Sequence, residues 1–228
     1  MEPIRAVIPA GGSSIRMNGI NKLVATVAGL PVIVRTIKAF DELEYIEQIV
    51  VVVPKEQHEL YLKLIKEYKV DSKVKFAYSG LSRRESVFNG LKELSDDEGI
   101  VLIHDAARPL VTKKIIDDCI EGAKRYGFCL AASRNTDTIK RADNIMFVEN
   151  TLDRQRIYNA QTPQAFKTEF ALDFHKRAQE ENLNVTDDSM IAEYYGHNVK
   201  IIESDTLNIK ITSKIDLLIA EAFLSNGD

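Results

Sequence analysis

A glycine-rich segment near the N-terminus carries residue types that suit phosphate binding. It reads Pro9-Ala10-Gly11-Gly12-Ser13-Ser14-Ile15-Arg16-Met17, and Lys22 follows it. Glycines allow backbone N–H groups to approach phosphate oxygens, and the two cations Arg16 and Lys22 can both reach a triphosphate. The segment matches neither the dinucleotide-binding fingerprint nor a Walker A loop. A surface turn with scattered cations is the alternative, but the position after a predicted strand favours ligand binding.

A second segment, His104-Asp105-Ala106-Ala107-Arg108-Pro109, directly follows a short apolar run. Asp105 suits a Mg²⁺ ion, because this cation is commonly held by one or two carboxylates together with substrate phosphates. Arg108 is placed to bind an anion. The alternative is an ion pair between Asp105 and Arg108 that has only a structural role. We expect His104 to be a hydrogen-bonded core residue rather than a base.

The remaining polar segments carry weaker signals. The loop from Ser79 to Val87 precedes a predicted helix, whose first N–H groups can bind an anion or read a base edge. A capped helix with a solvated basic turn explains the same residues. Other candidates, each of which is also an ordinary loop, cap or strand edge, are Asp153-Arg154, Gln161-Thr162-Pro163-Gln164, Thr186-Asp187-Asp188 and Asn208-Ile209-Lys210-Ile211-Thr212.

Composition excludes several classes of protein. The 228 residues include 30 Lys and Arg against 34 Asp and Glu, a net charge of −4, which argues against binding a long nucleic acid. A hydrophobic content of 45% argues against global disorder. Cys119 and Cys129 share no metal-ligand spacing with the histidines and are expected to be reduced interior thiols. We find no apolar run long enough for a membrane span and no leader peptide, so we expect a soluble, cytoplasmic protein.

Apolar runs alternate with segments of helical period, which predicts an α/β fold: a Rossmann-like, mostly parallel sheet with helices on both faces. Strands are expected at 6–8, 49–53, 74–77, 100–103, 128–132, 199–203 and 207–211. Helices are expected from about Pro31 and at 57–68, 85–94, 113–126, 168–181, 186–195 and 213–224. Thr112 is the expected N-cap of the fourth helix, and Gly127 suits its end.

The pattern changes over residues 133–156, where the chain is polar and alternating and has no helical stretch. We interpret this part as a β-arm that leaves the main sheet. Because no internal repeat or flexible linker is apparent, residues 1–228 are expected to form a single domain that carries the arm.

Taken in order, these segments resemble the 2-C-methyl-D-erythritol 4-phosphate cytidylyltransferases of the non-mevalonate isoprenoid pathway, a branch of the nucleotidyltransferase superfamily. The resemblance extends from Ala6 to Leu224. Its most specific part is the segment from His104 to Pro109, whereas the glycine-rich loop is shared more widely among nucleotidyltransferases.

The resemblance implies an enzyme that transfers a cytidylyl group from CTP to 2-C-methyl-D-erythritol 4-phosphate, with release of pyrophosphate. It implies Mg²⁺, with Asp105 as the ligand, and a homodimer whose β-arms interlock. The implied triphosphate and nucleotide contacts are Ala10, Gly11, Gly12, Arg16, Lys22, Gly80 and Ser86. The implied contacts to the sugar-alcohol phosphate are Asp105, Arg108, Thr138, Arg154, Thr162, Thr186 and Lys210, of which Thr138 and Arg154 are expected to serve the neighbouring subunit's site.

Three positions depart from the family pattern. Ser14 stands where a second glycine is common, Asn21 where a proline often precedes the lysine, and Leu81 where an acidic residue is frequent. These differences concern the shape of the nucleotide loops and not the two cations.

The expected reaction is attack by a phosphate oxygen of the sugar phosphate on the α-phosphorus of CTP. The nucleophile is largely dianionic at neutral pH, so no protein base is required. Fixed cations and a metal ion are the expected means of stabilising the charge. Arg16 and Lys22 are assigned to the α-phosphate and the leaving group, and Arg154 and Lys210 to the nucleophile's phosphate.

Two alternatives remain from the residues alone. A ribitol 5-phosphate cytidylyltransferase would share the fold and the glycine-rich loop, although the segments 105–109 and 138–141 resemble the methylerythritol branch. A phosphoacceptor signalling module would also place an aspartate after a buried strand. Such modules need an acidic pair after their first strand, where this chain has Pro9 and Ala10.

Overall fold

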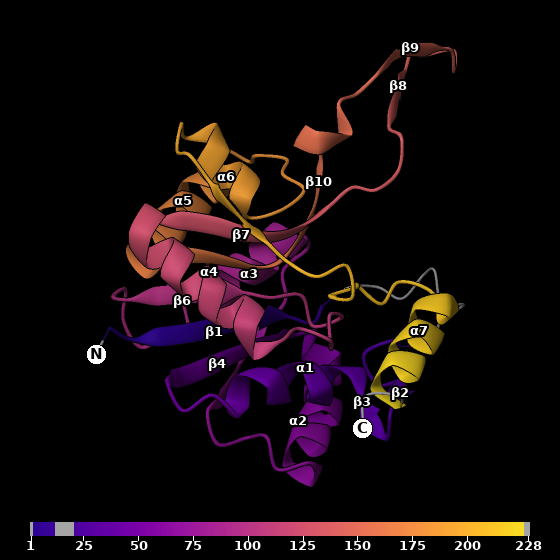
Figure 1. The fold of residues 1–228 in the computed structure, drawn as a ribbon. Helices are drawn as coiled ribbons and strands as arrows, with labels where there is room; N and C mark the ends of the chain where they lie inside the picture. The colour runs from indigo at the N-terminus through magenta and orange to yellow at the C-terminus, as the bar shows by residue number, and fades with distance from the viewer. Residues whose placement is uncertain (1, 12–20, 226–228) are drawn as a thin grey trace.

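Runs of β-branched residues form the centre of a seven-stranded sheet in the computed structural model, which describes residues 2–11 and 21–225 (Figure 1). The strand order is β11-β7-β10-β6-β1-β4-β5. All neighbouring pairs are parallel except those of β10, which is antiparallel to β6 and β7. The strands are β1 (Ile4–Pro9), β4 (Ile46–Val53), β5 (Val74–Tyr78), β6 (Ile100–Ile103), β7 (Phe128–Arg134), β10 (Tyr158–Lys167) and β11 (Lys200–Glu203).

Helices cover both faces of this sheet, and alternate residues of β1 point to opposite sides. Ile8 lies in the core cluster that includes α1 (Val32–Asp41), α2 (His58–Glu67) and α4 (Lys113–Tyr126). Val7 lies in the cluster on the other face, with α3 (Arg83–Leu91), α5 (Thr168–Glu180) and α6 (Ser189–Tyr194). A strand buried on both faces is typically apolar at consecutive positions, which is why Ala6, Val7 and Ile8 form a continuous apolar run. The predicted α/β class is confirmed.

Helix ends follow the predicted capping. The Thr112 side chain accepts a hydrogen bond from the N–H of Ile115 and caps α4, and Gly127 ends that helix with a φ of +83°. Cys119 and Cys129 are both buried and unpaired, as expected of interior thiols. Short 3-10 turns, η2 (Lys55–Gln57) and η3 (Arg154–Arg156), precede α2 and β10.

A β-hairpin projects from the body of the molecule between β7 and β10 (Figure 1). It consists of β8 (Lys140–Ala142) and β9 (Val148–Thr151), which pair antiparallel. Four consecutive side chains at and beside its tip, Ile145 to Val148, are between 61% and 84% exposed. The predicted β-excursion is therefore present, and its tip carries apolar residues that this chain alone leaves uncovered.

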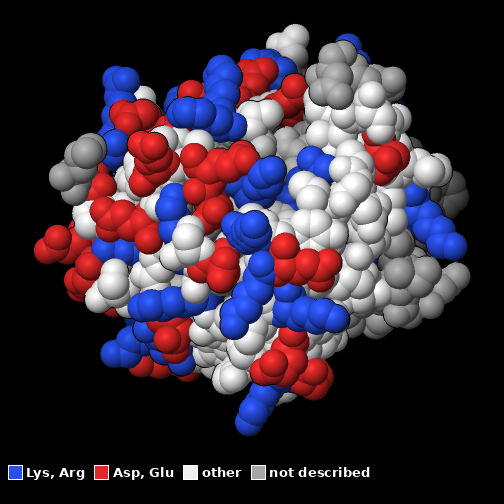
Figure 2. All heavy atoms as spheres, turned by 90° about the horizontal axis from the view of Figure 1, so that it is seen from below, with Lys and Arg blue, Asp and Glu red and all other residues white. Residues whose placement is uncertain are grey.

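The C-terminal helix α7 (Lys214–Ser225) lies against a small hairpin of β2 (Thr26–Val27) and β3 (Leu30–Pro31). Glu221 accepts a hydrogen bond of 2.6 Å from the backbone N–H of Ala28. Among the described residues, none of the helices has the length and apolar character needed to span a lipid bilayer. Figure 2 shows basic and acidic side chains interspersed on one face of the molecule, without an extended basic tract on that face.

Three predictions about the elements were wrong. The strand expected at 207–211 is absent: this segment begins as a turn and forms no strand ladder. Its backbone bonds to the loop after β6 through the N–H of Ile211, which donates to the carbonyl of Ala107. Strand β10 was missed, because Pro163 and a shift of register between Ala160 and Gln164 break its pattern. The helix expected at 186–195 begins only at Ser189.

Candidate functional site

A cavity of about 470 Å³ opens at the carboxyl ends of β1 and β6. Its position agrees with the rule that open α/β sheets bind ligands at this edge. Ala10 is held there by a 2.7 Å hydrogen bond from its N–H to the carbonyl of Val52. The residues that line the cavity are Pro9, Ala10, Gly11, Lys22, Leu23, Gly80, Leu81, Ser82, Arg83, Ser86, Asp105, Ala106, Ala107 and Lys210.

One wall of this cavity is the turn that leads into α3. Ser82 caps the helix by accepting a hydrogen bond from Glu85, and the hydroxyl of Ser86 accepts one of 3.1 Å from the N–H of Gly80. A Cβ atom at Gly80 would lie 2.4 Å from the Cβ of Glu85, and one at Gly11 would lie 2.7 Å from the Cβ of Ser79. Both glycines are therefore required by close approach. The predicted nucleotide contacts that lie within the described residues, Ala10, Gly11, Lys22, Gly80 and Ser86, all line this one cavity.

Two of the positions that depart from the family pattern can be located. Leu81 is fully exposed, and its N–H donates a 2.8 Å hydrogen bond to Glu85. Asn21 fastens the start of the lysine segment to α2: its amide donates to the hydroxyl of Tyr61 at 3.0 Å, and its side-chain oxygen accepts from the N–H of Leu23 at 3.1 Å. The backbone next to Lys22 is thus held by an asparagine side chain.

A second, smaller cavity of about 260 Å³ adjoins the first. Five of the seven residues predicted to bind the sugar phosphate line it: Asp105, Arg108, Thr162, Thr186 and Lys210. Arg83, Asp105 and Lys210 line both cavities and form the wall between them. Two spaces that share charged residues suit a reaction between two anionic substrates.

Asp105 is the centre of the charge arrangement in this wall. Lys210 Nζ lies 2.8 Å from one of its oxygens, Arg83 lies 3.3 Å from the other, and Arg108 Nε lies at 3.6 Å. Burial by itself raises the pKa of the Asp105 carboxyl, but Arg83, Lys210 and Arg108 outweigh burial and hold that pKa well below its usual range. The carboxylate is ionised at neutral pH. The ion pair with Arg108 exists, as the structural interpretation requires, and does not exclude a role in binding.

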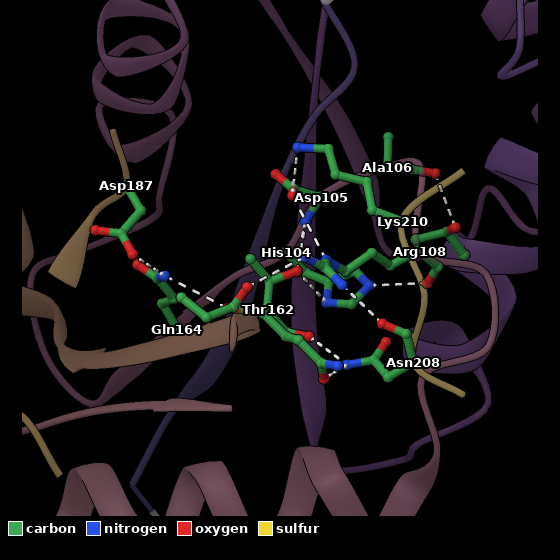
Figure 3. Close-up of polar contacts among 12 residues, drawn as sticks. His104, Asp105, Ala106, Arg108, Thr162, Gln164, Asp187, Asn208 and Lys210 are labelled. Atoms are coloured by element: carbon green, nitrogen blue, oxygen red, sulfur yellow. Dashed lines mark hydrogen bonds and ion pairs between the residues drawn. The ribbon is translucent and has the colours of Figure 1, made fainter. Parts of the chain in front are cut away.

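A buried hydrogen-bond chain fixes the loop that carries Asp105 (Figure 3). The N–H of Asp105 donates to the Thr162 hydroxyl at 3.0 Å, which lies 3.1 Å from Nδ1 of His104, and His104 Nε2 lies 3.1 Å from the carbonyl oxygen of Arg108. These contacts fit a ring whose Nε2 donates and whose Nδ1 accepts. Burial lowers the pKa of His104 to about 4, so the ring is neutral. His104 is a hydrogen-bonded core residue, as predicted.

The turn after β11, which contains Asn208 and Lys210, packs against the loop that carries Arg108 (Figure 3). Arg108 donates a 2.7 Å hydrogen bond to the carbonyl of Asn208, whose side-chain amide donates to the carbonyl of Thr162 at 2.8 Å and to Gln161 at 3.1 Å. These bonds place Lys210 beside Asp105. The local sequence pattern does not indicate the role of Asn208, because its contacts are to residues far away in the sequence.

Of the predicted site residues that the structure describes, two do not line either cavity of this chain. Thr138 and Arg154 are exposed on the arm, where Arg154 donates a 3.0 Å hydrogen bond to the carbonyl of Thr136. Gly12, Ser14 and Arg16 lie outside the described residues. Arg83, in contrast, lies in the wall between the cavities, although its local sequence predicts only a polar loop before a helix.

A sequence model of the IspD family, 2-C-methyl-D-erythritol 4-phosphate cytidylyltransferase, matches residues 4–226. A protein of that name from Caldanaerobacter subterraneus is 42% identical over 97% of this chain and 98% of its own length. Another, from Geobacillus thermodenitrificans, is 41% identical over 97% of this chain and 96% of its own. The chain belongs to the IspD family. The resemblance seen in the sequence is confirmed, and with it the transfer of a cytidylyl group to methylerythritol phosphate.

Solved structures agree with this assignment. A 4-diphosphocytidyl-2C-methyl-D-erythritol synthase from Anaerococcus prevotii has a TM-score of 0.87 and 30% identity, and the match covers 98% of this chain and 96% of that one. An IspD structure from Thermus thermophilus has a TM-score of 0.77 at 25% identity, covering 96% and 98%. A phosphoacceptor signalling module is thereby excluded.

A second buried histidine, His175 of α5, should make the stability of the folded protein depend on pH. Burial lowers its pKa to about 4, below the value near 6.5 of an unfolded chain, so the unfolded state binds more protons as the pH falls. Its contribution is present above pH 6.5 and is lost toward pH 4. We expect this residue to reduce the free energy of unfolding by about 2 kcal/mol between about pH 7 and pH 5.

Urea denaturation of the wild type and of His175→Gln at both pH values measures this contribution. The variant should lose less stability on acidification than the wild type, in which His104 and His175 both contribute. Equal losses in the two proteins would contradict the assignment to His175.

Proposed function

We propose that this IspD chain joins its two substrates across the wall of Arg83, Asp105 and Lys210. CTP occupies the larger cavity, and the sugar-alcohol phosphate occupies the smaller one. The observation that carries this proposal is that these three charged residues line both cavities. Arg83 and Lys210 flank the buried carboxylate of Asp105, and their positive charges can attract both phosphate groups to this wall. Asp105 pairs with both cations, so their charges are not left without a partner.

The chain's own residues bind and orient the reactants rather than transfer protons. A phosphate monoester has its second pKa near 6 and attacks the α-phosphorus as a dianion. His104, the histidine nearest to Asp105 in sequence, has both ring nitrogens engaged in hydrogen bonds and stays neutral. Lys22 and Arg16 are assigned to the triphosphate, and Lys210 to the nucleophile's phosphate. Their positive charge opposes the repulsion between the two anions and stabilises the transition state.

Asp105 is the residue that would hold Mg²⁺. Its carboxylate faces the cavity, and the described residues contain no group of three acidic, histidine or cysteine side chains that could hold a metal alone. A single carboxylate fits Mg²⁺, which takes its other ligands from phosphate oxygens and water. When bound, the ion would neutralise charge on the triphosphate.

Product analysis tests the proposed function. Purified protein is incubated with CTP, MgCl₂ and either methylerythritol 4-phosphate or ribitol 5-phosphate, and pyrophosphate and the cytidine diphosphate ester are quantified by ³¹P NMR. We expect a product only with methylerythritol phosphate. Preferential turnover of ribitol 5-phosphate would overturn the substrate assignment, and no turnover of either would overturn the proposal as a whole.

We further propose a homodimer in which the arm of one chain completes the site of the other. Thr138 and Arg154 lie on the arm outside both cavities of their own chain, and the tip exposes Met146 and Phe147 by 84% and 70%. A second copy that covers these side chains would remove apolar surface from water.

Replacement of Phe147 by aspartate should shift the protein from dimer to monomer, which size-exclusion chromatography with light scattering measures. Exposed Leu60→Asp on α2 is the control for a charge placed on another apolar surface position.

Mixing Arg154→Ala with Lys22→Ala should restore activity that neither variant has alone, because one site of each mixed dimer is intact. A monomeric wild type, or no restoration, contradicts the proposal.

A further inference from the structure

Arg83 occupies a position that the two substrates must share. It is the first residue of α3, directly after the N-cap Ser82, and its side chain is 30% exposed. Of the three residues common to both cavities, Arg83 and Lys210 are the cations, and they approach Asp105 on different oxygens. A phosphate in either cavity therefore meets a guanidinium from one side of Asp105 and an ammonium from the other.

A second carboxylate holds Arg83 in this place. Nη2 of Arg83 lies 2.8 Å from Asp188, against 3.3 Å from Asp105, so the shorter pair is the one with Asp188. Asp188 is 1% exposed and directly precedes α6, and its neighbour Asp187 lines the smaller cavity. Both contacts to Asp105, from Nε and Nη2, go to the same oxygen at 3.3 Å. Arg83 thus does not form a two-oxygen pair with Asp105.

The surroundings keep Asp188 available for Arg83. Among the described residues, one more group lies within ion-pair distance of Asp188: Nε2 of His175, at 3.5 Å. This ring is neutral because burial lowers its pKa to about 4. A neutral ring does not compete for the carboxylate charge. The residue after Asp188, Ser189, donates a 2.8 Å hydrogen bond from its backbone N–H to the side chain of Gln164. This bond fixes the segment that contains Asp188 to β10.

We propose that Arg83 binds the reacting phosphoryl groups at the junction of the two cavities and that Asp188 is the positioning residue that keeps Arg83 directed there. The inference rests on the proposed function of the two cavities. An arginine serves this purpose because its planar guanidinium can pair with a carboxylate and still present N–H groups to a phosphate. Asp188 prevents Arg83 from closing on Asp105, so that Asp105 stays free to accept Lys210 and a cation.

The neighbouring residue, Arg84, has a structural role at the start of the same helix. Arg84 is buried and donates a hydrogen bond to the carbonyl of Ala178 in α5, and it lines neither cavity. Arg83 and Arg84 are adjacent in sequence but have opposite surroundings. Arg84→Gln is therefore a matched control that should lower stability without changing the chemistry of the folded enzyme.

The test compares Arg83→Gln, Arg83→Lys and Asp188→Asn with Arg84→Gln and with exposed Arg125→Gln on α4. Initial rates of pyrophosphate release give kcat and KM, thermal unfolding gives stability, and calorimetric titration with CTP gives the number of binding sites. We expect Arg83→Gln to lower kcat roughly 10- to 100-fold, the scale of a hydrogen bond to a charged group, with CTP stoichiometry unchanged. Arg83→Lys should recover part of the loss, and Asp188→Asn should lower kcat less than Arg83→Gln.

Addition of millimolar guanidinium to Arg83→Ala provides a second measurement that does not depend on how well Arg83→Gln folds. Guanidinium should raise the rate of Arg83→Ala and leave Arg125→Ala unaffected. A folded Arg83→Gln enzyme with kcat within threefold of the wild type, or a loss explained by fewer CTP sites, overturns this inference alone. A wild type that releases no pyrophosphate with either sugar phosphate overturns the proposed function as well.

Discussion

Replacement of Asp105 by asparagine should destabilise the protein and, if Asp105 holds Mg²⁺ as proposed, raise the Mg²⁺ concentration that the reaction requires. The asparagine keeps the shape of the side chain but removes the negative charge that Lys210, Arg83 and Arg108 share within 2.8 to 3.6 Å. Removing one partner from a fully buried ion pair typically costs about 3–5 kcal/mol, because the other charge stays buried without compensation. Arg83 keeps its pair with Asp188, and the Lys210 side chain is 38% exposed, so the free energy of unfolding measured in urea should fall by less than that amount.

Activity of the Asp105→Asn variant distinguishes the two roles considered for this residue. If Asp105 holds the metal, the Mg²⁺ concentration for half-maximal rate should rise at least tenfold, and kcat should fall. Asp188→Asn is the matched control, because it also removes a carboxylate from Arg83 but does not line either cavity. An unchanged Mg²⁺ titration in a folded Asp105→Asn enzyme would leave the residue with only its structural ion pairs.

Elements with continuous apolar or strongly periodic sequences were predictable, and those with mixed patterns were not. The run from Ile49 to Val53 is β-branched throughout and can pack on both faces, so its identity as a buried strand follows from residue types alone. Strand β10 is equally central, between β6 and β7, but it contains Gln161, Thr162, Pro163 and Gln164. Gln161 and Thr162 are buried with hydrogen bonds to the side chains of Ser133, Asn208 and His104. The Gln164 side chain bonds to Asp187 and to the N–H of Ser189. No local pattern shows these partners.

The same limit applies to the site. Lys22 and Asp105 could be selected because each follows a predicted strand, at the edge where ligands bind. Arg83 has the same local signal as any solvated cation before a helix. Its significance comes from Asp105 and Asp188, which are contributed by the ends of other elements. Folding, rather than spacing along the chain, brings these three residues together.

A functional consequence follows from where the polar residues of β10 lie. Thr162 accepts a hydrogen bond from the N–H of Asp105, and its carbonyl accepts one from Asn208. One antiparallel strand thus supports both the carboxylate loop and the turn that carries Lys210. The positions of the two oppositely charged groups are coupled through buried hydrogen bonds, so neither requires a contact with substrate to be oriented.

Replacement of Lys22 by alanine should lower kcat roughly 10²- to 10³-fold, the scale for removing one preorganised stabilising group from a transition state. Lys22 lines the larger cavity together with Gly11 and Gly80. Charge on the bridging and leaving oxygens increases as pyrophosphate departs, so a fixed ammonium stabilises the transition state more than bound CTP. The loss should therefore appear mainly in kcat and only slightly in the KM for CTP.

The backbone beside Lys22 offers a control that separates its charge from its position. Asn21 holds this part of the chain through Tyr61 and the N–H of Leu23, so Asn21→Ala keeps the lysine but loosens its support. We expect Asn21→Ala to lose less activity than Lys22→Ala, and Lys22→Arg to retain more than alanine because it keeps the positive charge. Steady-state pyrophosphate release, with thermal unfolding to confirm folding, measures all three variants. Near-normal turnover of Lys22→Ala would show that the positive charge of this lysine does not stabilise the transition state.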